Sequence, residues 1–240
     1  PDFTFGYCSN LKSIDIPQIK KIGMLSFSFC TSFTSINFES LRDAGNSAFY
    51  FCISLRNVTL NNLEYAGTSL FHESSILQFL SLPNVTYIGR DFISNCRLID
   101  TLELPKLKRC EENSFQNTNL MKVEFNSLET CPYSLFANSQ AIKEVRMLRV
   151  THIGISAFEN CTNLNKVEMP NLEVIGSHGF ANCFSLTSID FPHLKIIGNY
   201  SLANCINITH IVINTVTDIG EYGLFNCSLL GSANCQELVN

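Results

Sequence analysis

Cysteine recurs along this chain at one fixed interval, and that interval constrains the fold more than any other feature. The separations are 22, 22, 44, 65, 22, 22 and 22 residues between Cys8, Cys30, Cys52, Cys96, Cys161, Cys183, Cys205 and Cys227. The remaining positions of the series hold Ser74, Thr118 and Ser139, and only the unit from Thr118 to Ser139 is one residue short. Such a repeat decides the architecture, because each unit is one structural element that stacks on the next.

Apolar residues follow each cysteine at four fixed distances. They stand three, six, eight and eleven positions later, as Leu164, Val167, Met169 and Leu172 do after Cys161. The spacing apolar-x-x-apolar-x-apolar is typical of a short strand with a buried inward side and a bend at each end. Stacking brings like residues of neighbouring units to the strand spacing of about 4.7–4.9 Å. We therefore expect a repeat solenoid of about ten 22-residue coils, with one short parallel strand in each.

Proline, glycine, phenylalanine and asparagine mark the ends of the expected strands. Proline stops the strand, since it lacks the N–H that a ladder needs. Glycine then marks a tight turn, and phenylalanine four residues later, as in Gly176 and Phe180, is the expected inward anchor. Asparagine precedes most of the later cysteines and is expected to support a bend. These asparagines are Asn95, Asn160, Asn182, Asn204 and Asn226.

The motif Cys-x-x-Leu-x-x-Ile-x-x-Pro-x-Leu-x-x-Ile-Gly-x-x-x-Phe-x-x-Cys, carried by units such as Cys161 to Cys183, resembles that of BspA-like leucine-rich repeat proteins. The resemblance covers essentially the whole chain. It implies a leucine-rich-repeat-type right-handed superhelix with its strands on the concave face. Family members are typically surface or secreted proteins of bacteria and parasitic protists, and the resemblance implies a role in adhesion and host interaction.

Residues 1–240 are expected to form a single leucine-rich repeat domain with partial repeats at 1–7 and 228–240. Phe5 stands where the anchor of a preceding unit belongs, and an eleventh unit begins with the spacing of Leu230, Ala233, Cys235 and Leu238. A fragment of a longer protein is favoured over a protein whose ends associate. The short unit and two displaced cysteines, Cys110 and Cys131, predict irregular coils around residues 108–139. A disulfide between these two and a buried reduced pair are both open.

The sequence holds no constellation typical of an enzyme or a metal site. Most of its eleven cysteines share one inward column, which favours core packing over disulfides. The five histidines fall in five phases of the repeat, and no metal-binding, nucleophile-elbow or phosphate-loop motif occurs. A formal net charge of -5 argues against a nucleic-acid partner. No apolar run reaches the roughly 18 residues of a membrane span. We expect no catalysis, no cofactor and no metal.

The outward side chains of the expected strands, five and seven residues after each cysteine, form the candidate binding surface. The seventh position is largely acidic, Arg146 stands among the acids, and Lys122 and Lys166 lie beside them. A solvated face with partial charge pairing is one interpretation, and a docking strip for a basic protein segment or a cation is the other. The candidate ligand-binding residues are Phe79, Glu103, Lys122, Glu124, Arg146, Lys166, Glu168 and Asp190.

The leading functional hypothesis is a non-catalytic interaction and adhesion module of a cell-surface or secreted protein. It would bind a protein or extracellular-matrix ligand through the exposed strand face. The alternative is a cytoplasmic leucine-rich repeat scaffold that uses the same face, which the abundant cysteines favour. A polysaccharide-active parallel β-helix enzyme is a third class, and it would need several strands per turn and clustered carboxylates.

Overall fold

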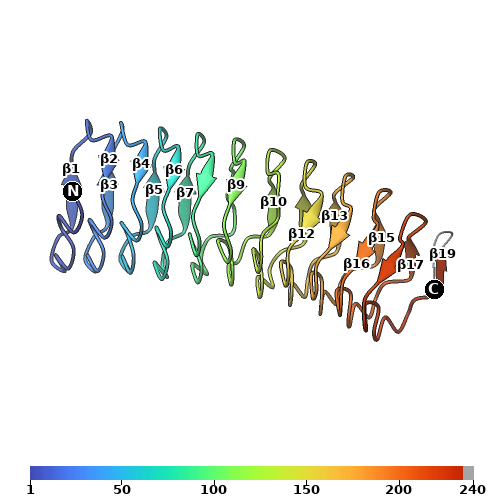
Figure 1. The fold of residues 1–240 in the computed structure, drawn as a ribbon. Coiled ribbons are helices and arrows are strands. Elements are labelled where there is room, and N and C mark those ends of the chain that lie inside the picture. Colours follow the sequence, from blue (N-terminus) through green and yellow to red (C-terminus); the bar gives the residue numbers. More distant parts are fainter. Residues whose placement is uncertain (235–240) are drawn as a thin grey trace. The chain divides into compact units, whose positions relative to one another are not determined.

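The structure is a computed structural model that describes residues 1–234, so the expected positions Cys235 and Leu238 of an eleventh unit lie outside the described residues. The chain divides into two compact units, Pro1–Leu120 and Met121–Asn240. Within each unit the chain forms successive coils that lie side by side (Figure 1). The repeat solenoid expected from the sequence is confirmed within both units.

Three-residue parallel strands form two short ladders in each unit. Partners in the recorded pairs, such as Val145 and Val167, are 22 residues apart, so equivalent positions of neighbouring coils lie in register. In the first unit the strands are β1 (Ser13–Asp15), β3 (Ser35–Asn37), β5 (Asn57–Thr59) and β7 (Phe79–Ser81). In the second they are β10 (Lys122–Glu124), β11 (Glu144–Arg146), β13 (Lys166–Glu168), β15 (Ser188–Asp190), β17 (His210–Val212) and β19 (Ser232–Asn234). The ladders are β1-β3 and β5-β7 in the first unit, and β10-β11-β13 and β15-β17-β19 in the second.

A second ladder of two-residue strands exists where one strand per coil was expected. It contains β2 (Lys21–Ile22), β4 (Asp43–Ala44), β6 (Tyr65–Ala66), β8 (Tyr87–Ile88) and β9 (Arg109–Cys110) in the first unit. It contains β12 (His152–Ile153), β14 (Val174–Ile175), β16 (Ile196–Ile197) and β18 (Asp218–Ile219) in the second. Several of these strands are followed by a glycine, which lets neighbouring coils approach closely enough to pair. A Cβ on Gly45 would lie 2.6 Å from the carbonyl carbon of Gly23. None of the described glycines has a positive φ, so the close approach of neighbouring coils explains the recurrence of glycine in the repeat better than turn geometry does.

Two coils depart from the regular pattern. Residues 101–104 form no strand, although Leu102 and Leu104 are buried and this coil still contributes β9. In the second unit, Cys131 contributes only an isolated parallel bridge to Ile153. In both places the core contacts persist while the ladder is interrupted.

The core is built from columns of like residues. The anchor phenylalanines stack, with ring centroids 5.6 Å apart between Phe27 and Phe49 and 5.3 Å between Phe49 and Phe71. The same column in the second unit places Phe158 and Phe180 5.1 Å apart. All five side chains are at most 1 % exposed, which confirms the expected inward anchors.

The cysteine column is buried and also hydrogen-bonded. The thiol of Cys52 donates to the carbonyl of Phe27 at 3.3 Å, and that of Cys96 donates to the carbonyl of Phe71 at 3.1 Å. Ser74 makes the equivalent bond through its hydroxyl. Cys131 is a buried free thiol, so at this residue the structure holds the reduced alternative. Core packing is confirmed for the repeated cysteines between Cys30 and Cys205, whereas Cys8 is exposed and Cys227 is half-buried. The role of these thiols as donors is an addition.

Candidate functional site

The outward side of β10, β11 and β13 carries six charged side chains in register. The central residues Val123 and Val145 of β10 and β11 point into the core and are at most 2 % exposed. The flanking residues therefore project outward, because side chains alternate along a strand. We call this set the charge mosaic; it consists of Lys122, Glu124, Glu144, Arg146, Lys166 and Glu168.

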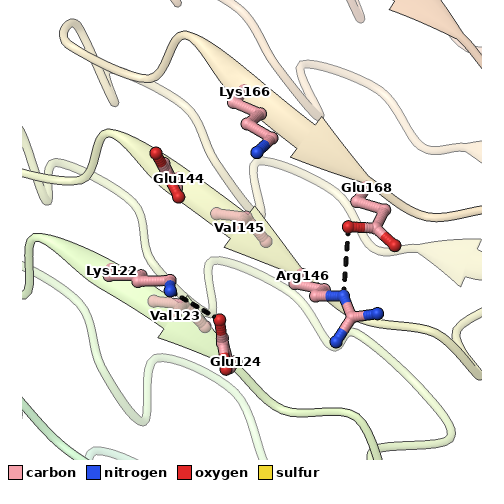
Figure 2. A pocket seen from close by; sticks show the side chains of 8 residues that line it. All are labelled: Lys122, Val123, Glu124, Glu144, Val145, Arg146, Lys166 and Glu168. Carbon is pink, nitrogen blue, oxygen red and sulfur yellow. Dashed lines mark hydrogen bonds and ion pairs between the residues drawn. The ribbon is translucent and has the colours of Figure 1, made fainter.

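The mosaic lines a hollow of about 240 Å³, which Figure 2 shows from close by. Its residues form two rows that cross the three strands. The first row reads Lys122, Glu144 and Lys166, and the second reads Glu124, Arg146 and Glu168. Charge alternates along both rows and along each strand, so every nearest neighbour within the mosaic has the opposite sign.

Two ion pairs form within the mosaic. Lys122 Nζ lies 2.7 Å from Glu124 Oε1, and Arg146 Nε lies 3.0 Å from Glu168 Oε2 (Figure 2). The hydrogen bond with Glu124 raises the pKa of Lys122, and the same bond lowers the pKa of Glu124. The expected partial charge pairing is confirmed here. The side chains in these pairs are 42–60 % exposed, and such exposed pairs contribute little to stability.

Glu144 and Lys166 are opposite charges on adjacent strands, yet neither forms an ion pair with any residue in the described part of the chain. Glu144 was not among the residues expected at the site. Its position, five residues after Ser139, places it in the same outward row as Lys122 and Lys166. The signal was therefore present in the period, but the alternation of sign became evident only when the strands were in register.

Asp190 belongs to β15, the next strand of the same unit, and its side chain is exposed. It forms no ion pair within residues 1–234. Its neighbour in register, Val212 on β17, is apolar. Asp190 thus remains an exposed carboxylate beside the mosaic.

The other two expected site residues meet in the first unit. Phe79 on β7 is 51 % exposed and, together with Glu103 and Pro105, lines a hollow of about 300 Å³. This hollow lies where the ladder stops, because residues 101–104 form no strand. The structure therefore places the expected site residues in two groups: Phe79 and Glu103 in one unit, and Lys122, Glu124, Arg146, Lys166, Glu168 and Asp190 in the other.

A further polar hollow, of about 420 Å³, lies beside the second ladder and was missed by sequence reasoning. Arg149, Glu173 and His193 line it, and Lys195 Nζ lies 2.9 Å from Glu173 Oε2. The hydrogen bond with Lys195 lowers the pKa of Glu173. Over the described residues, no three His, Cys, Asp or Glu side chains are grouped so as to hold a metal ion.

Comparison with known protein families identifies the family to which the repeat belongs. The BspA type leucine rich repeat region matches in six copies, over residues 1–122, 77–170 and 129–240. The chain belongs to the BspA-type leucine-rich repeat family. The resemblance seen in the motif is thereby confirmed.

Solved structures of similar fold include other leucine-rich repeat proteins. A leucine-rich repeat protein from Bacteroides ovatus is 23 % identical, with a TM-score of 0.66, covering 97 % of this chain and 74 % of that one. A leucine rich cell surface protein from Faecalibacterium prausnitzii is 23 % identical, with a TM-score of 0.53, covering 98 % and 75 %. The pneumococcal vaccine antigen PcpA is 18 % identical, with a TM-score of 0.55, covering 95 % and 69 %. These likenesses establish the fold.

Comparison with curated proteins gave no match. Within the described residues, no helix has the length and apolar character needed to cross a bilayer.

Proposed function

We propose that this BspA-type chain is a non-catalytic interaction and adhesion module that binds a protein or extracellular-matrix ligand through the outward face of its three-residue strands. The observation that carries the proposal is the charge mosaic: six charged side chains project from three strands whose central residues are buried on β10 and β11 and half-buried on β13. The hydrogen-bonded ladder beneath them holds the backbone in place, so less conformational entropy is lost when a ligand binds. The proposed binding residues form two separate groups. Phe79 and Glu103 belong to the first unit, and the mosaic with Asp190 belongs to the second.

A cell-surface or secreted location is part of the proposal. Family membership supports it, as does the description of one protein of similar fold as a leucine rich cell surface protein. The cytoplasmic scaffold remains the second candidate, because the buried cysteines such as Cys52, Cys96 and Cys183 are free thiols, as is usual in a reducing compartment. That residues 1–240 act as one domain stays a prediction.

The enzyme alternative has less support in the chemistry of the face. A glycosidase needs two carboxyl groups with separate roles. Here Glu124 and Glu168 are each ion-paired, to Lys122 and Arg146 respectively. We propose no catalytic role for this surface.

Charge reversal at two carboxylates tests the proposed face. The double substitution Glu124→Lys and Glu168→Lys should weaken binding of a basic ligand about tenfold or more, because two attractive contacts become repulsive. The probes are immobilised collagen, laminin and fibronectin, together with an oligolysine peptide, and the readout is surface plasmon resonance. The thermal midpoint should change little, since both side chains are exposed.

The matched control is Glu129→Lys with Glu221→Lys. Both residues are exposed carboxylates of the same unit that lie outside the three-residue strands, and the change in net charge is identical. Binding should survive in this control. Equal affinity of the strand-face variant and the wild type, or no binding of the wild type to any probe, would contradict the proposal.

A further inference from the structure

We infer that the charge mosaic is self-complementary and that a second copy of this chain is a partner of the strand face. The inference rests on the proposed function in one respect: it requires this face to be a binding surface. All six mosaic residues belong to the unit Met121–Asn240, so the geometry involves one unit only. A two-fold symmetric interface uses the same patch on both copies, and the patch must therefore complement itself.

The arrangement of signs meets that requirement in one orientation. Consider two copies placed face to face, with the two-fold axis running along the stacking direction between the two rows of the mosaic. This rotation keeps the order of the coils and exchanges the rows. Lys122 of one copy then faces Glu124 of the other, Glu144 faces Arg146, and Lys166 faces Glu168. Every charge of the mosaic meets an opposite charge.

The other in-plane two-fold axis is excluded by the same signs. An axis along β11 would keep each row and reverse the order of the coils. Glu144 of one copy would then face Glu144 of the other, Arg146 would face Arg146, and Lys122 would face Lys166. Like charges brought together in this way cost free energy, so the pattern selects a single orientation.

Two features make these charges available to a partner. Glu144 and Lys166 form no ion pair with any described residue, although they occupy neighbouring positions in register (Figure 2). The two pairs that do form are exposed, and such pairs contribute little to the stability of a single chain, so their replacement by intermolecular pairs costs that chain little.

The strand next to the mosaic is compatible with the same rotation. On β15, Ser188 of one copy would face Asp190 of the other, so a hydroxyl donor meets a carboxylate acceptor. On β17, His210 would face Val212. The rotation therefore brings no like charges together across the strands β10, β11, β13, β15 and β17.

Charge alternation also lowers repulsion within a single chain, and that simpler role predicts a monomer. The experiment separates the two roles with the full chain and two variants. Lys166→Glu places two carboxylates face to face, opposite Glu168 of the other copy. An inverted variant carries Lys122→Glu, Glu124→Lys, Glu144→Lys, Arg146→Glu, Lys166→Glu and Glu168→Lys; it keeps the net charge and the alternation.

Sedimentation equilibrium of the wild type at about 0.1 mM protein should show a dimer in about 20 mM salt that dissociates in about 500 mM salt, because the contacts are ionic. Lys166→Glu should weaken the dimer about tenfold or more, and the inverted variant should dimerise like the wild type. The far-ultraviolet circular dichroism of each variant confirms that it is folded.

A monomeric wild type at low salt would overturn the inference, as would a Lys166→Glu dimer of unchanged affinity or an inverted variant that stays monomeric. These outcomes are distinct from failure of the proposed ligand binding. A monomer that still binds a matrix protein overturns self-recognition alone. A dimer that binds none of the matrix probes overturns the ligand proposal alone.

Discussion

The asparagine before each of the later cysteines meets two requirements with one side chain. Its backbone is left-handed, with φ of 60° at Asn160 and 61° at both Asn182 and Asn204. Its amide also joins neighbouring coils: Asn182 donates to Asn160 at 2.8 Å, and Asn204 donates to Asn182 at 2.7 Å. The bend expected from the sequence is confirmed, and a hydrogen-bonded ladder accompanies it. Asparagine suits this position because it tolerates positive φ better than most residues and has both a donor and an acceptor.

Substitution of Asn182 separates these two roles. Asn182→Ala should lower the free energy of unfolding by about 2–4 kcal/mol, since it loses two ladder bonds and places a Cβ-bearing residue without compensation at positive φ. Asn182→Gly relieves the backbone strain only and should cost less. Urea unfolding of both variants provides the measurement. Equal stability of Asn182→Ala and wild type would show that the ladder contributes nothing.

The thiol column explains why serine can replace cysteine in this repeat. The thiol of Cys183 donates to the carbonyl of Phe158 at 3.2 Å, and the hydroxyl of Ser74 donates to Phe49 in the same way at 3.3 Å. The position therefore requires a small side chain with a hydrogen to donate. The sequence indicates the small size of the side chain, and the structure adds the need for a hydrogen-bond donor.

Buried thiols should make the protein sensitive to alkaline pH. Burial raises the pKa of Cys96 and of Cys205 to about 12, from an ordinary value of 9.0. The folded state thus favours the neutral thiol, so this contribution to stability is complete below about pH 9 and is lost as the pH rises towards 12. Each such thiol should contribute a slope of at most about 1.4 kcal/mol per pH unit in that window.

Denaturant unfolding between about pH 8 and pH 11 measures this slope. The double variant Cys96→Ser and Cys205→Ser should show a shallower decline than the wild type, because serine does not titrate in this range. Parallel profiles for the two proteins would contradict the assignment of the slope to these thiols.

Among the elements, the two-residue strands depend on the absence of a side chain at the following glycine. A Cβ on Gly176 would lie 2.8 Å from the carbonyl oxygen of Ile153, which itself accepts the Gly176 N–H at 2.8 Å. The neighbouring atoms are backbone, so they cannot rotate away. The second ladder therefore exists because glycine permits coils to approach, and a pattern of apolar residues does not reveal such an approach.

Addition of one methyl group tests this account. Gly176→Ala should destabilise the protein by about 1–3 kcal/mol, since the coils must separate or the ladder bonds must lengthen. The matched control is Gly231→Ala, where the nearest atom to an added Cβ is the Thr209 carbonyl oxygen at 4.0 Å. Thermal unfolding should show a lower midpoint for Gly176→Ala alone. Identical midpoints for both variants would refute the steric argument.

At the scale of the whole molecule, stacking contacts within the units hold successive coils together. The following cysteines are free thiols: Cys8, Cys30, Cys52, Cys96, Cys131, Cys161, Cys183, Cys205 and Cys227. Coils of a solenoid stabilise their neighbours through shared core columns, and we expect these columns to carry the stability of the protein.

Reductant should therefore leave the stability unchanged. The melting temperature of the native protein should be the same with and without dithiothreitol, and scanning calorimetry measures both. A lower melting temperature in reductant would show that a disulfide contributes to the fold. The same result would favour the secreted location over the cytoplasmic alternative.

The sequence alone determined the coils, the inward columns and the outward rows. Those features repeat with the period, and a residue's phase in the repeat, such as that of Phe158 or Arg146, is enough to place it on one side of its coil. The family followed from the same phase. The phase of Glu144 in the repeat places it in an outward row, but this phase alone did not identify it as part of the binding surface.

The tertiary structure decided what depends on contacts between neighbouring coils, whose partners are 22 positions apart in the ladders and 25 apart in the thiol hydrogen bonds. The thiol donors, the asparagine ladder, the second ladder and the opposite neighbours of Glu144 all arise between coils. So does the local loss of the strand at residues 101–104, where Leu102 keeps its buried phase but its backbone leaves the ladder. Hydrogen bonds and ion pairs require atoms within a few ångströms, and a linear pattern specifies the side of a coil without specifying that separation.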